Sequence, residues 1–275
     1  MVQEDATLKG KTIAITRPSG QAEEVAEMIK KRGGKPYFIP AIEIKGPNDL
    51  SPIKDFIGEL QKGKVDYVIF MSVNGVRYLL SASESLRQLD ATLEGLKKTI
   101  TVAVGPRTAQ ELKTNKIPVN LVPSKYTSEG LLESLRQRDI SGKTICMPRT
   151  SGATPILKEK LGEMGAIVKE VYVYDSMLPI NKNLREKFFQ DLTAKKIDAI
   201  IFGSALSVKN LFQMLSDQSS PEKLRDLMNR KAAVVAIGPV TADALVEMGV
   251  KVDAMPDRHL FEEALSALAR YWNQD

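Results

Sequence analysis

The sequence predicts an α/β protein made of two similar halves, each a parallel β-sheet covered by helices. Two observations carry this prediction: a long internal repeat, and short β-branched apolar runs that alternate with segments of helical periodicity. Such alternation is typical of parallel sheets whose strands are joined by helices. The 275 residues, 43% hydrophobic and 27% charged, suit two globular domains of roughly 100 to 150 residues each.

The repeat consists of three segments that return in the second half of the chain at a nearly constant offset. The matching pairs, offset by 132, 132 and 133 residues, are Lys11–Gly20 with Lys143–Gly152, Val65–Ser72 with Ile197–Ser204, and Val104–Ala109 with Ile237–Ala242. Solenoid repeats have periods of roughly 20 to 50 residues, so this one indicates a duplicated domain. We expect two lobes facing each other, with the cleft between them as the default ligand site.

Buried strands are predicted at six short apolar runs. They are, in chain order, Ile13–Ile15, Val68–Phe70, Ile100–Val104, Ile145–Met147, Ile200–Phe202 and Val234–Ile237. Amphipathic helices are predicted between them from apolar residues spaced three and four apart. The clearest stripes are Ile53, Phe56, Ile57 and Leu60; Phe261, Ala264, Leu265, Leu268 and Trp272; and the matched pair Val25, Met28 and Ile29 with Leu157, Leu161 and Met164.

Two longer extended runs interrupt this rhythm. Pro36–Ile44 and Ile167–Met177 occupy equivalent places in the repeat, after glycines that end a helix, and each leads to a proline. Runs of this length could continue beyond one sheet as connections between the halves. A two-stranded linker of this kind would be a natural hinge.

Composition excludes several classes of function. The formal net charge is +5 and the pI is near 9.1, but the basic residues are spread among 34 acidic ones, so a nucleic-acid partner is not expected. Met1–Asp5 is polar, and no run approaches the ~20 apolar residues of a membrane span, so we expect a cytoplasmic protein with no membrane partner. Cys146 and His259 are the only residues of their types, which argues against disulfides, thiolate metal sites and a Ser/His/Asp triad. We expect His259 to be a surface residue.

The repeated blocks end where ligands bind in parallel sheets, beyond the carboxyl ends of the strands. The segments at these positions are Arg17–Gly20 and Arg149–Gly152, Ser72–Gly75 and Ser204–Ser207, and Gly105–Thr108 and Gly238–Thr241. Their Ser, Thr and Asn side chains could cap the following helices or could bind an anion there. Their recurrence in both halves favours a polar anion-binding cleft.

Nucleotide motifs are not supported. Gly10-Lys11-Thr12 and Gly142-Lys143-Thr144 resemble the end of a P-loop, but each precedes its predicted strand, and the upstream glycine of that motif is absent. No Gly-x-Gly-x-x-Gly is present, and no distinctive motif supports a flavin.

Tyr174 lies on the second extended run. Strand alternation predicts that Tyr172 and Tyr174 share one face of the run, while Val171 and Val173 share the other. A phenol is protonated at neutral pH, so it can donate a proton but is a poor base. The alternative is an aromatic side chain that only packs at the hinge.

At this point the sequence resembles the uroporphyrinogen-III synthase family of tetrapyrrole biosynthesis over nearly its whole length. The segments that carry the resemblance are Thr16–Pro18, Ser72–Val76, Val104–Ala109, Pro123–Leu131, Val173–Ser176 and Ile237–Ala242. The resemblance implies two flavodoxin-like domains joined by a two-stranded β ladder. The implied bounds are residues 1–40 plus 176–275 for one domain, 46–168 for the other, and 37–47 and 167–178 for the linkers.

The resemblance also implies a substrate and a reaction. The substrate is hydroxymethylbilane, a linear tetrapyrrole with eight carboxylates, and no cofactor or metal is used. Proton-assisted loss of its hydroxyl gives an azafulvene, which ring D attacks at its substituted carbon; the resulting spiro intermediate fragments and recloses with ring D inverted. A monomer is expected.

Site residues follow from the same resemblance. Tyr174 is the candidate proton donor, and Thr108 and Thr241 match paired threonines of the family. The further expected substrate contacts are Arg17, Ser19, Ser72, Asn74, Thr127, Arg149, Ser151 and Ser204. The chain departs from the family pattern at Leu206, where a hydroxyl is usual, and at Asp175-Ser176. The alternatives left open are a non-catalytic two-lobed protein that binds a small anionic ligand, and a flavin protein.

Overall fold

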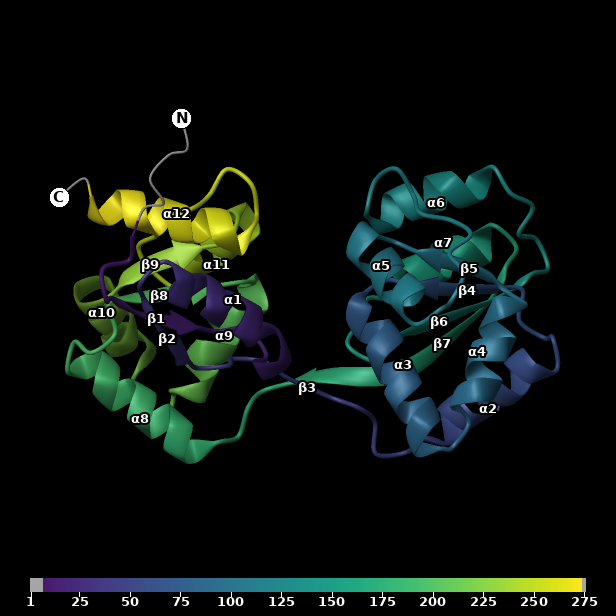
Figure 1. Cartoon of the computed structure of the whole chain (residues 1–275), viewed down its shortest axis with the longest axis horizontal. Coiled ribbons are helices and arrows are strands. Elements are labelled where there is room, and N and C mark those ends of the chain that lie inside the picture. Colours follow the sequence, from purple (N-terminus) through teal and green to yellow (C-terminus); the bar gives the residue numbers. More distant parts are fainter. Residues whose placement is uncertain (1–6, 274–275) are drawn as a thin grey trace. The chain divides into compact units, whose positions relative to one another are not determined.

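The computed structural model describes residues 7–273, which form two compact units (Figure 1). The split unit consists of the described residues up to Glu43 together with those from Met177 onward, and the continuous unit is Ile44–Ser176. The polar segment Met1–Asp5, which contributes to the expectation of a cytoplasmic protein, lies outside the described residues. Within residues 7–273, no helix combines the length and the apolar character needed to cross a bilayer.

The split unit is a parallel sheet with strand order β2-β1-β8-β9. Its strands are β1 (Thr12–Ile15), β2 (Lys35–Phe38), β8 (Ala199–Phe202) and β9 (Ala233–Ala236). Its helices are α1 (Ser19–Lys31), α8 (Lys182–Thr193), α9 (Ala205–Met214), α10 (Pro221–Lys231), α11 (Pro239–Glu247) and α12 (Phe261–Trp272).

The continuous unit has strand order β3-β7-β6-β4-β5, and β7, β6, β4 and β5 are parallel. Its strands are β3 (Glu43–Lys45), β4 (Tyr67–Phe70), β5 (Ile100–Ala103), β6 (Thr144–Thr150) and β7 (Ile167–Met177). Its helices are α2 (Ser51–Gln61), α3 (Val73–Ser85), α4 (Leu89–Lys97), α5 (Pro106–Thr114), α6 (Ser128–Arg136) and α7 (Ile156–Glu163). All six predicted strands are confirmed.

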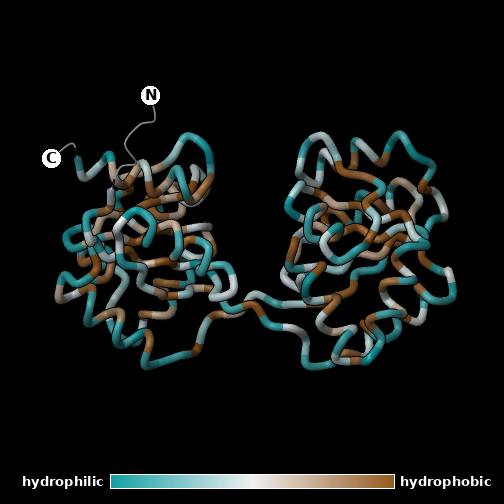
Figure 2. Tube along the Cα trace, in the orientation of Figure 1, coloured by the Kyte–Doolittle hydropathy of each residue, from teal (hydrophilic) through white to brown (hydrophobic). Residues whose placement is uncertain are grey.

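Each sheet has a hydrophobic core on both of its faces. In the split unit, Ile200 and Phe202 belong to one cluster of buried residues, while Ala199 and Ile201 belong to another. Successive side chains of a strand point to opposite faces, so an uninterrupted apolar strand requires helices on both sides. Figure 2 shows the matching pattern, with hydrophobic stretches mainly inside each unit and hydrophilic loops around them.

The repeated Gly-Lys-Thr segments fasten the beginning of a strand. The Thr12 amide donates to Asp198 Oδ2 at 2.8 Å, and the Thr144 amide donates to Asp66 Oδ2, also at 2.8 Å. The lysine that precedes each threonine pairs with the same aspartate. These segments therefore connect neighbouring strands at their amino ends, opposite to the edge where a P-loop would lie.

The run Pro36–Ile44 is not one long strand, contrary to the prediction. It is divided between β2, in the sheet of the split unit, and β3, which lies next to β7 in the continuous unit. Pro40 lies between them and has no amide hydrogen to donate to a ladder. The Ala41 amide instead donates to the Thr16 carbonyl at 3.0 Å as the chain leaves the sheet.

The prediction that Tyr172 and Tyr174 share a face is wrong because β7 contains a bulge. Arg149 of β6 pairs with Tyr172, but Thr150, the next residue, pairs with Tyr174, so the register shifts by one residue at Val173. Val173 and Tyr174 consequently both join the same core cluster, while Tyr172 is 44% exposed. Bulges re-aim side chains in this way.

Candidate functional site

The Tyr174 hydroxyl forms a hydrogen bond with a serine at the end of β4. The distance between Tyr174 OH and Ser72 Oγ is 3.2 Å, and either hydroxyl can be the donor. Ser72 is the N-cap of α3, and its Oγ accepts from the Gly75 amide at 3.2 Å. Because that amide occupies an acceptor position of Ser72, the serine proton remains available to the phenol oxygen.

Close packing holds this pair in place. A Cβ on Gly75 would lie 2.7 Å from the Pro148 carbonyl oxygen, so only glycine lets the first turn of α3 approach β6 this closely. The Tyr174 ring packs against Tyr78, with the ring centroids 5.6 Å apart. Tyr78 in turn donates its hydroxyl to the Ile44 carbonyl at 2.6 Å. Tyr174 is only 9% exposed as a whole residue, and its hydrogen bond to Ser72 is partly buried.

Ser151 binds the residue that follows Tyr174. Its amide donates to Asp175 Oδ1 at 3.2 Å, and its hydroxyl donates to the same oxygen. The segment after β6 is thereby fastened to β7 beside the tyrosine. The chain departs from the family pattern at Asp175, and in the structure this carboxylate accepts hydrogen bonds from Ser151.

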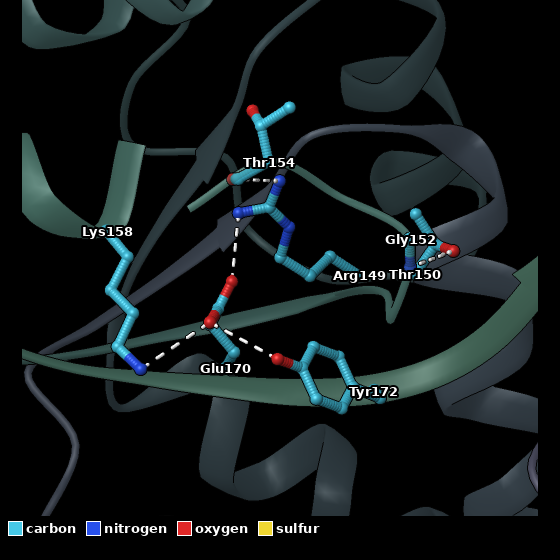
Figure 3. A network of polar contacts seen from close by, with 7 residues as sticks. All are labelled: Arg149, Thr150, Gly152, Thr154, Lys158, Glu170 and Tyr172. Carbon is cyan, nitrogen blue, oxygen red and sulfur yellow. Dashed lines mark hydrogen bonds and ion pairs between the residues drawn. The ribbon is translucent and has the colours of Figure 1, made fainter. Parts of the chain in front are cut away.

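Arg149 is engaged by β7 and by its own loop (Figure 3). Its Nη1 donates to Glu170 Oε1 at 3.1 Å, and its Nη2 donates to the Thr154 carbonyl at 3.5 Å. Glu170 also pairs with Lys158 at 3.6 Å and accepts from the Tyr172 hydroxyl at 3.3 Å. Arg149 is 8% exposed, so this arrangement holds the loop after β6 and leaves little of the guanidinium accessible to a ligand.

The other predicted residues of the continuous unit lie at helix N-termini. Thr127 is the N-cap of α6 and accepts from the Gly130 amide at 3.1 Å. Thr108 is the third residue of α5 and is 4% exposed. Asn74 is the second residue of α3. Thr127 therefore caps the helix, which is one of the two roles that the sequence left open, and its hydroxyl also forms a hydrogen bond with the Glu129 carboxylate.

The split unit repeats this arrangement with different side chains. Ser204 caps α9 in a reciprocal box with Ser207, and Thr241, 4% exposed, is the third residue of α11. Arg17 donates to Gln21 Oε1 at 2.6 Å, and its guanidinium lies 4.6 Å from the centre of the Phe261 ring. Ser19 is exposed and begins α1.

Chemically, the continuous unit offers a proton donor supported by a second hydroxyl. If Tyr174 releases its proton, the Ser72 hydroxyl can donate to the resulting phenolate, and the N-terminus of α3 favours that negative charge. Within residues 7–273, no three His, Cys, Asp or Glu side chains are arranged to hold a metal ion. A surface depression of about 290 Å³ lies at the amino ends of β4 and β5, lined by Tyr67, Ile100 and Lys143 among others, away from this chemistry.

Sequence reasoning missed the residues that support the site. Tyr78 reads as one more apolar position of a helix, and Glu170 reads as an exposed charge on a strand. His259 is exposed, as predicted, but it also lies against α11: a Cβ on Gly238 would be 2.9 Å from its ring. No local pattern could have revealed these contacts, because the partners are distant in the sequence.

Comparisons with known proteins identify a family. A family model described as uroporphyrinogen-III synthase HemD matches residues 23–266. A putative uroporphyrinogen-III synthase from Methanothermobacter thermautotrophicus is 34% identical over 96% of this chain and 99% of its own length. A uroporphyrinogen-III synthase from Chlorobaculum parvum is 26% identical over 90% of this chain and 93% of its own length.

The fold has a solved counterpart. A mutant uroporphyrinogen III synthase from Thermus thermophilus superimposes with a TM-score of 0.65 and 24% identity, covering 96% of this chain and all of that one. At this identity the likeness shows the fold, a mixed α/β arrangement of parallel sheets flanked by helices.

Proposed function

The chain belongs to the uroporphyrinogen-III synthase family, and we propose that it closes hydroxymethylbilane, with inversion of ring D, to uroporphyrinogen III. The family match and the 34% identical relative extend over most of the chain, and an enzyme is therefore favoured over a non-catalytic binding protein. The observation that carries the chemistry is the partly buried hydrogen bond between Tyr174 and Ser72.

Tyr174 is the proposed general acid. Its phenol proton passes to the terminal hydroxyl of the substrate, the carbon–oxygen bond breaks, and water leaves with that proton. Ser72 then donates its hydrogen bond to the phenolate while the azafulvene undergoes attack by ring D. The proton that ring D loses when aromaticity returns can restore the phenol, so the enzyme needs no external proton source over the cycle.

Ten side chains are proposed to bind the substrate or shape its site. They are Arg17, Ser19, Ser72, Asn74, Thr108, Thr127, Arg149, Ser151, Ser204 and Thr241. Hydroxyls and amides at helix N-termini suit carboxylates, because the helix dipole and free backbone amides favour negative charge there. For Arg149 and Ser151, the bonds to Glu170 and Asp175 support a positioning role in place of direct binding.

The finer points of architecture belong to the same proposal. The strand order β2-β1-β8-β9 supports a flavodoxin-like fold for the split unit. In the repeat, β6 corresponds to β1 and β4 to β8, so the order β7-β6-β4-β5 supports the same fold for the continuous unit. The domain bounds 1–40 plus 176–275 and 46–168, the linkers 37–47 and 167–178, a cytoplasmic location, a monomeric state and the lack of a cofactor stay predictions.

The test is to supply hydroxymethylbilane, oxidise the product, and resolve the porphyrin isomers. We expect mainly the isomer with ring D inverted, while an enzyme-free control gives the uninverted isomer. Uninverted porphyrin alone in both samples would refute the proposal. A binding protein without activity would retain the substrate and leave the isomer ratio of the control unchanged.

A further inference from the structure

The two units differ in the polarity of the exposed side chains at equivalent positions beyond the carboxyl ends of their strands. The split unit exposes Leu206, Val240 and Leu260 there, with exposed fractions of 46%, 72% and 41%. Isolated exposed apolar residues are normal, but these three all lie at the same edge of one sheet. Val240 is the second residue of α11, Leu206 is the second residue of α9, and these two helices pack against each other.

The internal repeat identifies the counterparts of these residues in the continuous unit. Leu206 corresponds to Asn74, Val240 to Arg107 and Leu260 to Thr127, at offsets of 132, 133 and 133 residues. The structure supports this equivalence, because the isolated parallel bridge between Val102 and Leu121 recurs between Val235 and Ala254, again 133 residues later. At these three positions the continuous unit is therefore polar and the split unit apolar, although the exposed Tyr126 lies next to Thr127 in the continuous unit.

Leu260 lacks the helix-capping hydrogen bond that its counterpart makes. It is the N-cap of α12 and makes no side-chain cap hydrogen bond, whereas Thr127 caps α6 with its hydroxyl. Leucine is among the least favourable residues at an N-cap. An exposed leucine at a position that favours a hydroxyl indicates that something other than helix stability determines its identity.

We propose that Leu206, Val240 and Leu260 form a contact surface for the apolar faces of the substrate's pyrrole rings. This inference rests on the proposed function. Hydroxymethylbilane combines four flat pyrrole rings with eight carboxylates, so a protein that folds it must contact both kinds of surface. Arg107 is exposed and forms no ion pair with an acidic side chain of the described residues, so its guanidinium suits a carboxylate. Val240, its counterpart, suits a ring face.

The experiment replaces the apolar residues by polar ones of similar size. Val240→Thr exchanges a methyl for a hydroxyl, and Leu206→Asn installs the residue of the other unit. The matched control is Val246→Thr, which makes the same exchange at a 66% exposed position near the other end of α11. The readouts are KM and kcat for hydroxymethylbilane, and the Kd of uroporphyrin III from fluorescence quenching, at about 0.05 M and about 0.5 M salt.

Loss of the contact made by one buried methyl weakens binding about fourfold. The double variant, which carries both Val240→Thr and Leu206→Asn, should therefore raise KM and Kd on the order of tenfold. The rise should be the same at both salt concentrations, because apolar contacts are not screened, whereas Arg107→Gln should weaken binding mainly at low salt. Val246→Thr should behave as the unchanged protein.

Unchanged KM and Kd in the double variant, or a loss that depends on salt as for Arg107→Gln, would overturn the inference. So would a protein dimer that the double variant dissociates without affecting KM or Kd, because the surface would then belong to a second copy. If the unchanged protein makes only uninverted porphyrin, the proposed function fails separately, and the uroporphyrin titration alone decides the inference.

Discussion

Replacing Tyr174 by phenylalanine should impair turnover while leaving the fold nearly unchanged. The ring and its packing against Tyr78 are kept, and the substitution removes the 3.2 Å hydrogen bond between the phenol and Ser72. One such bond contributes about 0.5–1.5 kcal/mol to the free energy of unfolding. Ser72 still accepts from the Gly75 amide, so its oxygen keeps a partner.

The effect on catalysis should be much larger. A positioned general acid accelerates a reaction about 10²- to 10⁴-fold, which corresponds to about 2.7–5.5 kcal/mol of transition-state stabilisation. We expect kcat to fall by about that factor, with little change in KM, because the phenol acts on the departing hydroxyl. The share of uninverted porphyrin should rise, because the substrate has more time to close spontaneously.

The assay combines steady-state kinetics, isomer analysis and chemical denaturation. Tyr37→Phe is the matched control, since it also removes one hydroxyl hydrogen bond of 3.2 Å, in this case to Asp191. It should lower stability by at least as much, because its acceptor is an ionised carboxylate, and leave kcat unaffected. If kcat and the isomer ratio of Tyr174→Phe equal those of the unchanged protein, Tyr174 is not the proton donor.

Three further predictions concern other parts of the chain. Ser72→Ala and Ser220→Ala each remove a helix N-cap and should each lower the free energy of unfolding by about 1 kcal/mol, but only Ser72→Ala should also lower kcat; equal kinetics for both would separate Ser72 from the chemistry. Burial raises the pKa of the Cys146 thiol to about 12, so iodoacetamide should modify it near pH 8 only after unfolding, as followed by mass spectrometry, and rapid labelling of the folded protein would contradict this. The hydrogen bond from Lys187 lowers the pKa of Asp191, so this carboxylate stabilises the fold above its unfolded pKa of about 3.9, and the contribution disappears as the pH falls through the folded value. Asp191→Asn should therefore be destabilising in denaturation near pH 7 and much less so in acid, and a deficit that persists in acid would refute this assignment.

Local patterns were sufficient for most of the fold. The apolar run Ile200–Phe202 is a strand because β-branched and aromatic residues favour extended structure, and the stripe Ile53–Leu60 is a helix because its spacing gives one continuous apolar face. The duplication was equally visible, because Lys143 and Asp66 keep in one unit the roles that Lys11 and Asp198 have in the other.

Site geometry was less accessible. Tyr174 could be selected by resemblance, but its orientation depends on a bulge that strict alternation does not anticipate. Arg149 reads as a ligand for an anion, yet it is buried against Glu170, a residue 21 positions away on the neighbouring strand. Such pairings arise only when strands come into register.

By itself, the sequence determined the secondary structure, the repeat and the edge of each sheet where polar groups gather, because these depend on residue spacing and on local backbone preferences. The tertiary structure decided which hydroxyl meets Tyr174, which charge neutralises Arg149, and which apolar residues at the strand ends of the split unit are exposed. The physical reason is that hydrogen bonds and burial depend on distance in space, and a shift of one residue in strand register reassigns the partners of every side chain that follows.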